Sequence, residues 1–327
     1  MTDNVLSANI YAAGLLDDLI ARAIAPFWHE AKNLLGERFL LWLVRYSRRG
    51  EHLKVRVHGD PQDAHVLKEL LTDHVRRYLH QVGGLPAAPR RAALPDIPAI
   101  DPEDEIAIAA PDRSLMWTTY QRSAVTMASP WLDFEGFAER SYKCMARACE
   151  WVLFLFEESD SPTPTARQKL LIEALVTGLP ALGLHGDRVA PYLRYHRDWL
   201  LRFLLRDADR EETALHQLSR QVGKRSTTVD QIRRLASSAL RPPKDPAGYS
   251  VRFAAALSEL SGYLESIRGL IDRDADPFAS DMAFPPVFKV MHNLANQCGL
   301  PLLEEAYIHH LVFAAMSPEV ALCGVAS

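Results

Sequence analysis

The 327-residue chain lacks the cysteine and histidine spacing that metal and disulfide proteins require. Its four cysteines, at positions 144, 149, 298 and 323, form no CxxC pair, and no cysteine–histidine cluster has zinc-site spacing. Cys144 and Cys149 lie five residues apart on an apolar helical pattern, which turns them to different faces of a helix. We therefore expect separate reduced thiols, a cytoplasmic location and no bound metal.

Signals for membranes, secretion, nucleic acids and common cofactors are missing as well. No apolar run approaches the length of a membrane span, and the acidic N-terminal stretch with Asp3, Asp17 and Asp18 is unlike a secretory signal. The formal net charge of −4 argues against a dedicated nucleic-acid-binding protein. There is no GxGxxG, P-loop or GxSxG motif, so we predict no cofactor.

The most informative stretch that is present runs from Arg38 to Gly59. The runs FLLWLVRY and HLKVRVH flank Ser47–Gly50, a pattern typical of a β-hairpin. The first run is apolar on both faces, which predicts an inner strand. The second run alternates between an apolar face and a basic face. The apolar face has Leu53, Val55 and Val57, and the basic face has His52, Lys54, Arg56 and His58.

The basic face of this hairpin has two interpretations. A four-residue loop would place Arg45 directly across from His52, and the row of cations would then form a clamp for an anion or a carbonyl group. The alternative is an ordinary solvated face. Arg45 favours the first interpretation, because an arginine inside FLLWLV needs an anionic partner, a ligand or water.

The order of predicted elements indicates one α+β domain over residues 1–327, with a largely antiparallel sheet from the N-terminal third and a mainly helical remainder. A proline-rich stretch at about 85–103 is predicted to be a mobile linker. Further strands are expected at 6–12, 105–109 and 115–122. Helices are expected at 15–35, with a break or kink at Pro26, and at 61–82, 133–157, 170–182, 189–205, 214–240, 249–271, 286–298 and 301–315.

Two other places hold candidate functional side chains. His292 and Asn296 are one turn apart on a predicted helix, so they share a face and Asn296 is placed to hold the imidazole in one tautomer. Tyr120 and Arg122 end a predicted strand just before a loop, where Tyr120 is a possible proton donor. The structural alternatives are a histidine bonded to the backbone and a tyrosine that only packs.

These stretches resemble a known family. A strand ending in VRYS, a short turn and then HLKVR is similar to the IRY…HLRLR hairpin of the C-terminal domain of class I lanthipeptide dehydratases. That domain also occurs alone in thiopeptide biosynthesis. The run from His292 to Gly299, followed by Glu304 and Glu305, is similar to the family's HxxxNR…G…E helix. Thr119 through Trp131 stands where the family has YxxE…RYGG. The order of these elements spans nearly the whole chain.

The resemblance implies one of two activities. Elimination domains remove glutamate from glutamylated serine or threonine of a precursor peptide. Stand-alone pyridine synthases join two dehydroalanines in a formal [4+2] cycloaddition and release water and the leader peptide. Three departures favour the second: SANIY lacks the basic residue of elimination domains, Gln297 replaces the family's arginine, and AVTMASPW replaces the RYGG element.

The expected function is therefore that of a cofactor-independent thiopeptide pyridine synthase. Its expected partner is a modified precursor peptide with leader and core, together with other enzymes of the pathway. Glutamate elimination and a non-catalytic leader-binding subunit are the alternatives. The catalytic candidates are Arg45, His52, Tyr120 and His292. The substrate-binding candidates are Lys54, Arg56, His58, Arg122 and Asn296.

Overall fold

The structure is a computed structural model that describes residues 5–46, 51–83, 113–119, 136–159, 161–239, 248–267 and 284–317. The chain divides into two compact units, Met1–Thr163 and Pro164–Ser327. All the described strands lie in the first unit, and the described part of the second is helical, which confirms the predicted α+β class. The prediction of a single domain stays a prediction, and the predicted linker at 85–103 lies outside the described residues.

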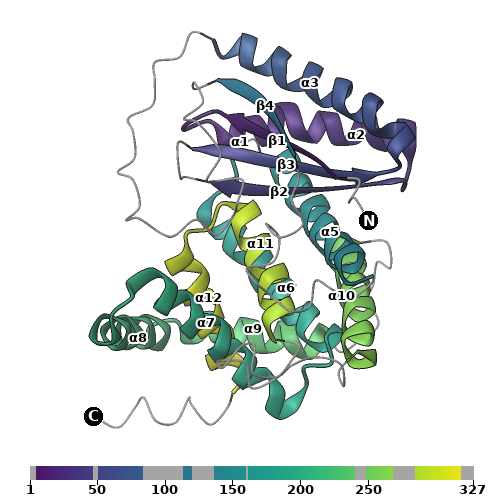
Figure 1. Ribbon diagram of the computed structural model, residues 1–327. Coiled ribbons are helices and arrows are strands. Elements are labelled where there is room, and N and C mark those ends of the chain that lie inside the picture. The colour runs from purple at the N-terminus through teal and green to yellow at the C-terminus, as the bar shows by residue number, and fades with distance from the viewer. Residues whose placement is uncertain are drawn as a thin grey trace. The chain divides into compact units, whose positions relative to one another are not determined.

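A four-stranded antiparallel sheet forms the centre of the first unit (Figure 1). Its strands are β1 (Val5–Tyr11), β2 (Phe39–Tyr46), β3 (His52–Gly59) and β4 (Ser114–Thr119), in the spatial order β2-β3-β1-β4. The hairpin and the first strand are thus confirmed. The prediction that FLLWLVRY is an inner strand is wrong, because β2 lies at the edge of the described sheet and β3 lies inside it. The strand predicted at 105–109 falls outside the described residues.

Helices cover one face of this sheet, as the alternation in β3 requires. Figure 1 shows α2 (Ala25–Leu35) and α3 (Ala64–Gln81) on the same side of the strands. The side chains of Leu53, Val55 and Val57 are buried on that side, where Leu67 of α3 approaches Gly59. The long helix α5 (Phe137–Glu158) packs on β2, and its Tyr142 ring stacks on Trp42 at a centroid distance of 4.8 Å.

The helix predicted at 15–35 has an irregular middle. It comprises α1 (Leu16–Leu19), a π-helical turn at Ile20–Ile24, and α2. Pro26 stands in the first turn of α2, directly after the π-helical turn, and it has no backbone N–H to donate to that turn. The chain therefore stays helical through Pro26, and the wider π turn lies directly before it.

The second unit contains seven described helices. They are α6 (Pro164–Ala181), α7 (Val189–Leu205), α8 (Ala208–Gly223), α9 (Ser226–Ala239), α10 (Tyr249–Ser266), α11 (Phe284–Cys298) and α12 (Leu302–Met316). The single helix predicted at 214–240 is two helices. Gly223 ends the first, and Ser226 begins the second after two intervening residues.

Helix α12 is the centre of this unit. It contacts α6, α7, α8, α9 and, through Glu305, the imidazole of His292 on α11. Its sequence LLEEAYIHHLVFAAM is apolar nearly all round, which is typical of a helix buried on every side. The polar side chains that it does bury, Glu305, His309 and His310, must therefore be satisfied by neighbouring helices.

Two general expectations can be compared with the described residues. Cys144, Cys149 and Cys298 are buried thiols, as predicted. Among the described helices, none combines the length and the apolar character that a transmembrane span needs.

Close packing at Gly178 gives a first test of the second unit. A Cβ atom at this position of α6 would lie 2.8 Å from Leu257 of α10 and 2.8 Å from Met291 of α11. Gly178→Val is therefore expected to lower the free energy of unfolding by about 1–3 kcal/mol through overpacking.

The matched control is Gly262 in α10, where no heavy atom lies within 4 Å of the added Cβ. Gly262→Ala should raise the free energy of unfolding by about 0.5–1 kcal/mol, because alanine favours the helix. Denaturant titrations measure both changes. Equal stability of Gly178→Val and wild type would mean that the three helices do not pack as described.

Candidate functional site

The hairpin places Arg45 and His52 on opposite faces of the sheet. Tyr46 pairs with His52 across β2 and β3, and Arg45 pairs with Leu53. The prediction that Arg45 lies directly across from His52 is therefore wrong. The connection between the strands spans residues 47–51, one residue more than assumed, and a shift of one position moves a side chain to the other face.

Arg45 has the anionic partner that its position among apolar residues predicts. Its Nη1 atom lies 2.7 Å from a carboxylate oxygen of Asp17 in α1, and its guanidinium carbon lies 5.6 Å from the centre of the Phe156 ring. The Asp17 pair offsets the cost of placing a charge among apolar side chains. These contacts account for Arg45 within the first unit.

The basic row of β3 is not a solvated face. Relative exposure is 3% for His52, 0% for Lys54 and 4% for Arg56, whereas His58 is half-buried. His52 lies between two tyrosine rings, with centroid distances of 4.7 Å to Tyr11 and 5.5 Å to Tyr46. The Lys54 ammonium lies 4.1 Å from the centre of the Tyr46 ring. Burial this deep excludes the interpretation of an ordinary solvated row.

Polar side chains of β1 adjoin this row. Ser7 pairs with Arg56 and Asn9 with Lys54 across the strands. Both side chains are buried, and Ser7 Oγ and Asn9 Oδ1 have no hydrogen-bond partner within the described part of the chain. Two acceptor groups beside two cations make this face suited to binding amide and carbonyl groups.

The second candidate site is a hydrogen-bonded network in the helical unit. Tyr192 and His196 come from α7, one turn apart, His292 comes from α11, and Glu305 lies in the first turn of α12. The Tyr192 hydroxyl lies 3.1 Å from His196 Nδ1, and His196 Nε2 lies 2.8 Å from Glu305 Oε1. The other carboxylate oxygen, Oε2, lies 2.8 Å from His292 Nδ1. Glu305 thus accepts one hydrogen bond on each oxygen.

The carboxylate fixes the tautomers of both histidines. Because Glu305 only accepts when it is ionised, His196 must carry its proton on Nε2 and accept the Tyr192 hydroxyl at Nδ1. Likewise His292 donates through Nδ1, which leaves its Nε2 as the lone-pair nitrogen when the ring is neutral. The residue that orients His292 is therefore Glu305, whereas the sequence pointed to Asn296.

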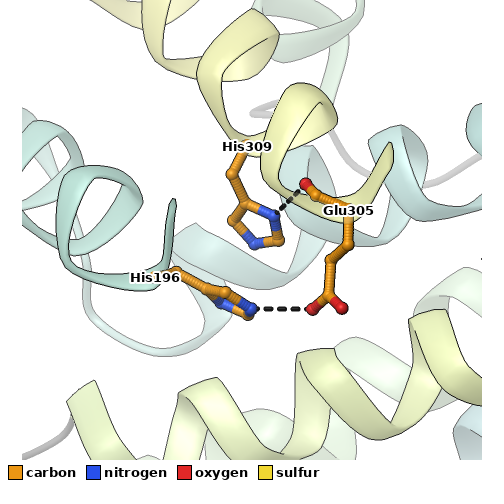
Figure 2. Close-up of side chains that lie close together, drawn as sticks. All are labelled: His196, Glu305 and His309. Carbon is orange, nitrogen blue, oxygen red and sulfur yellow. Dashed lines mark hydrogen bonds and ion pairs between the residues drawn. The ribbon is translucent and has the colours of Figure 1, made fainter. Parts of the chain in front are cut away.

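His309 lies against this network, as Figure 2 shows. Its Nδ1 atom donates to the backbone carbonyl of Glu305 at 2.9 Å, and its ring lies 3.6 Å from that of His196, centroid to centroid. Its Nε2 atom is buried and has no hydrogen-bond partner among the described residues.

Burial and charge move the pKa values of the histidines in opposite directions. Burial lowers the pKa of His196 well below its usual value and that of His309 to about 4, so both rings are neutral. Burial also acts to lower the pKa of His292, but the Glu305 carboxylate outweighs it, and the net shift is upward. His292 is therefore the ring of this network whose charged form is favoured over that of an ordinary histidine.

His292 is also the end of the network that solvent reaches. Its side chain is 32% exposed, whereas those of His196 and Glu305 are 0% exposed. A partly exposed histidine that is held at one nitrogen by a buried carboxylate has the arrangement of a general acid–base catalyst. The network can thus move a proton at His292 Nε2 without any change in the orientation of the ring.

The same network contains a possible set of metal ligands. Ligand atoms of His196, Glu305 and His309 lie within 4.8 Å of one another, and two histidines with one carboxylate suit a transition metal. The hydrogen bond from His196 to Glu305 would have to give way to an ion. The prediction of no metal stays a prediction.

Sequence reasoning found part of this site and missed part. It selected His292 and noted Glu304 and Glu305 after it, but gave these acidic residues no role. Nothing in the local sequence singles out Tyr192 and His196, which lie about a hundred residues before Glu305. Tyr120 and Arg122 fall outside the described residues. The hairpin residues belong to the first unit, and His292 and Asn296 belong to the second.

The chain belongs to the family described as the C-terminal domain of lantibiotic biosynthesis dehydratases, whose profile matches residues 6–316. This confirms the resemblance seen in the hairpin and the C-terminal helix. The protein is therefore related to the enzymes that modify ribosomally made lanthipeptides and thiopeptides. No curated protein matches the chain by sequence.

Solved structures share the fold. The chain is similar to the pyridine synthase TbtD from thiomuracin biosynthesis, with a TM-score of 0.62 and 15% identity, covering 99% of this chain and 100% of TbtD. It is similar to TsrL, with a TM-score of 0.61 and 13% identity, over 97% of this chain and 95% of TsrL.

A third similar structure is a larger enzyme, the tRNA-dependent lantibiotic dehydratase MibB from Microbispora sp. 107891. The TM-score is 0.53 and the identity 13%, over 98% of this chain but only 28% of MibB. At these identities the comparisons establish the fold that the proteins share.

The buried neutral histidines predict how stability depends on pH. His309 and His310 both have their pKa lowered to about 4, chiefly by burial, whereas an unfolded histidine titrates near 6.5. Their contribution to stability is complete above pH 6.5 and decreases as the pH falls towards 4, because the unfolded chain then binds the protons. The contribution of each histidine to the free energy of unfolding is expected to fall by about 3 kcal/mol across this range.

Denaturant titrations between pH 7 and pH 4.5 measure this loss. His310→Gln, which keeps polar atoms near Arg197 and Ser219, should reduce the fall in the free energy of unfolding between these pH values. His216→Gln is the control, since that side chain is 78% exposed and should leave the decline unchanged. An identical decline in His310→Gln and wild type would contradict the neutral buried state.

Proposed function

We propose that this protein is a pyridine synthase that joins two dehydroalanines of a modified precursor peptide in a formal [4+2] cycloaddition. The observation that carries the proposal is the orientation of His292, whose Nδ1 is held by buried Glu305 while its side chain stays 32% exposed. Family membership and the fold shared with TbtD over the full length of both chains support it.

The reaction needs proton transfer at several atoms and no external oxidant. One dehydroalanine and the amide before it, as the iminol, supply four ring atoms, and the second alkene supplies two. Two carbon–carbon bonds form. Loss of the iminol hydroxyl with one ring proton releases water, and loss of the leader as its carboxamide with a second ring proton completes the pyridine.

Both eliminations require a base for a C–H proton and an acid for the leaving group. A single imidazole can do both in turn, because it takes a proton at Nε2 and returns it to the departing group. Holding the two alkenes together can contribute roughly 7–11 kcal/mol by proximity alone. The basic row of β3, with His52, Lys54, Arg56 and His58, remains the candidate for binding peptide carbonyls, and half-buried His58 is its most accessible member.

Glutamate elimination is the second candidate, since the same base could remove the Cα proton of a glutamylated serine while glutamate leaves from Cβ. Mass spectrometry separates the candidates. A dehydroalanine-containing, azole-bearing precursor should lose water and a leader-sized carboxamide. Loss of glutamate from a glutamylated precursor would instead identify an elimination enzyme, and no change with either peptide would indicate a binding subunit.

His292→Phe tests the role of the histidine. The phenyl ring keeps the packing against Phe288, whose ring stacks at 5.6 Å, but removes the proton-transfer nitrogen. The rate constant in single-turnover assays is expected to fall by about 10²-fold or more, while the affinity for the peptide is largely kept. His216→Phe on exposed α8 is the matched control. Wild-type turnover by a folded His292→Phe protein would remove His292 from the site.

A further inference from the structure

The helical unit contains a groove that the proposed chemistry does not use. It has a volume of about 1310 Å³ and is formed by α6, α8, α9 and α12. Sites for drug-sized molecules have volumes of about 300–1,000 Å³, so this groove is large enough for a segment of polypeptide.

The floor of the groove is apolar and comes from all four helices. Leu218, Ile232 and Leu311 are buried along it, and Ile172 lines the side that α6 forms. At one edge Leu303 is 47% exposed, which makes it one of the few large exposed apolar side chains among the described residues. Such a floor suits the apolar stripe of an amphipathic helix.

The rim of the groove carries cations without partners. Lys169, Arg210, Lys224 and Arg225 are exposed, and none has a side-chain ion pair or hydrogen bond within the described part of the chain. The segment 202–239 has eight lysines and arginines against five acidic residues, a net charge of +3 in a chain of net charge −4. The cationic rim therefore differs from the rest of the molecule and favours an acidic partner.

Acidic side chains also line the groove, but two of the three are constrained. Burial raises the pKa of Glu173, and Glu304 lies 3.5 Å from the amide nitrogen of Gln168. The third, Asp209, lies in the first turn of α8, where a carboxylate is stabilised by the helix dipole. The four cations thus dominate the rim.

Helix α12 separates this groove from the catalytic network. Glu304, Tyr307 and Leu311 line the groove, whereas Glu305 and His309 face His196. A helix with its side chains is about 10–12 Å thick, and an extended chain advances about 3.3–3.6 Å per residue. A peptide anchored in the groove could therefore cover the distance to the network with a few extended residues.

From these observations we infer that the groove docks an acidic, amphipathic helical segment of the precursor peptide, its leader, while the core of the same peptide reacts beyond α12. The apolar stripe of the segment lies on Leu218, Ile232 and Leu311, and its carboxylates meet the rim cations. The identification of the segment as a leader rests on the proposed function. The inferred affinity of the groove for an acidic helix is independent of the proposed function.

The probes are two fluorescein-labelled 18-residue model peptides with leucine at the same helical positions, one with glutamate and one with lysine at the flanking positions. Fluorescence anisotropy should show the glutamate peptide binding at least tenfold more tightly than the lysine peptide, with affinity falling as salt rises. Equal binding of the two peptides, or no binding of the glutamate peptide, would overturn the inference.

Charge reversal locates the site. Lys224→Glu with Arg225→Glu should weaken binding of the glutamate peptide at least tenfold and strengthen binding of the lysine peptide. The matched control is Arg220→Glu with Arg234→Glu, on the adjoining helices α8 and α9 but outside the groove, which should change either affinity less than twofold. Equal weakening by both double variants would show that the net charge of the protein, and not the groove, binds the peptide.

A third measurement separates the leader assignment from the proposed function. With a precursor that the enzyme converts, the groove variant should raise KM at least tenfold and leave single-turnover rate at saturation unchanged, the reverse of His292→Phe. An unchanged KM would overturn the leader assignment while the cycloaddition stands. Tight, groove-dependent binding of the glutamate peptide without conversion of any precursor would overturn the cycloaddition, and with it the leader assignment.

Discussion

The helical unit depends on one buried carboxylate. Glu305 has no exposed side-chain surface, and burying an unpaired carboxylate would cost several kcal/mol. Hydrogen bonds from His196 on α7 and His292 on α11 offset that cost, so the three helices must keep their register for Glu305 to stay ionised. The same two bonds set the tautomers of both rings and leave the second nitrogen of His292 available for proton transfer.

Helix α12 shows how one element can serve two surfaces. Its sequence is apolar nearly all round, so it has neighbours on every side. Adjacent residues at its N-terminus point to different neighbours: Glu304 lines the groove and Glu305 belongs to the proton-transfer network. Anchoring of a peptide on one side and reaction on the other are thus both proposed for a single rigid helix.

The sequence predicted elements better than it predicted contacts. The alternation in HLKVRVHG correctly assigned the two faces of β3, and the position of Arg45 correctly implied an anionic partner. The length of the hairpin connection cannot be read from SRRGE, however, and one extra residue put Arg45 and His52 on opposite faces. Alternation also could not reveal that the basic face of β3 is buried, because burial depends on segments remote in sequence. For the same reason His292 was found from its family-like helix, while His196, which lies 109 positions before Glu305, was not.

The central claim is that Glu305 orients His292 and raises its pKa, and titration of the histidine rings by NMR tests it most directly. In the wild-type protein the His292 ring should titrate with a pKa above 6.5. In Glu305→Gln, which keeps a hydrogen-bond acceptor but removes the negative charge, burial should bring the pKa of His292 below 6.5. A His292 pKa that is the same in both proteins would contradict the account.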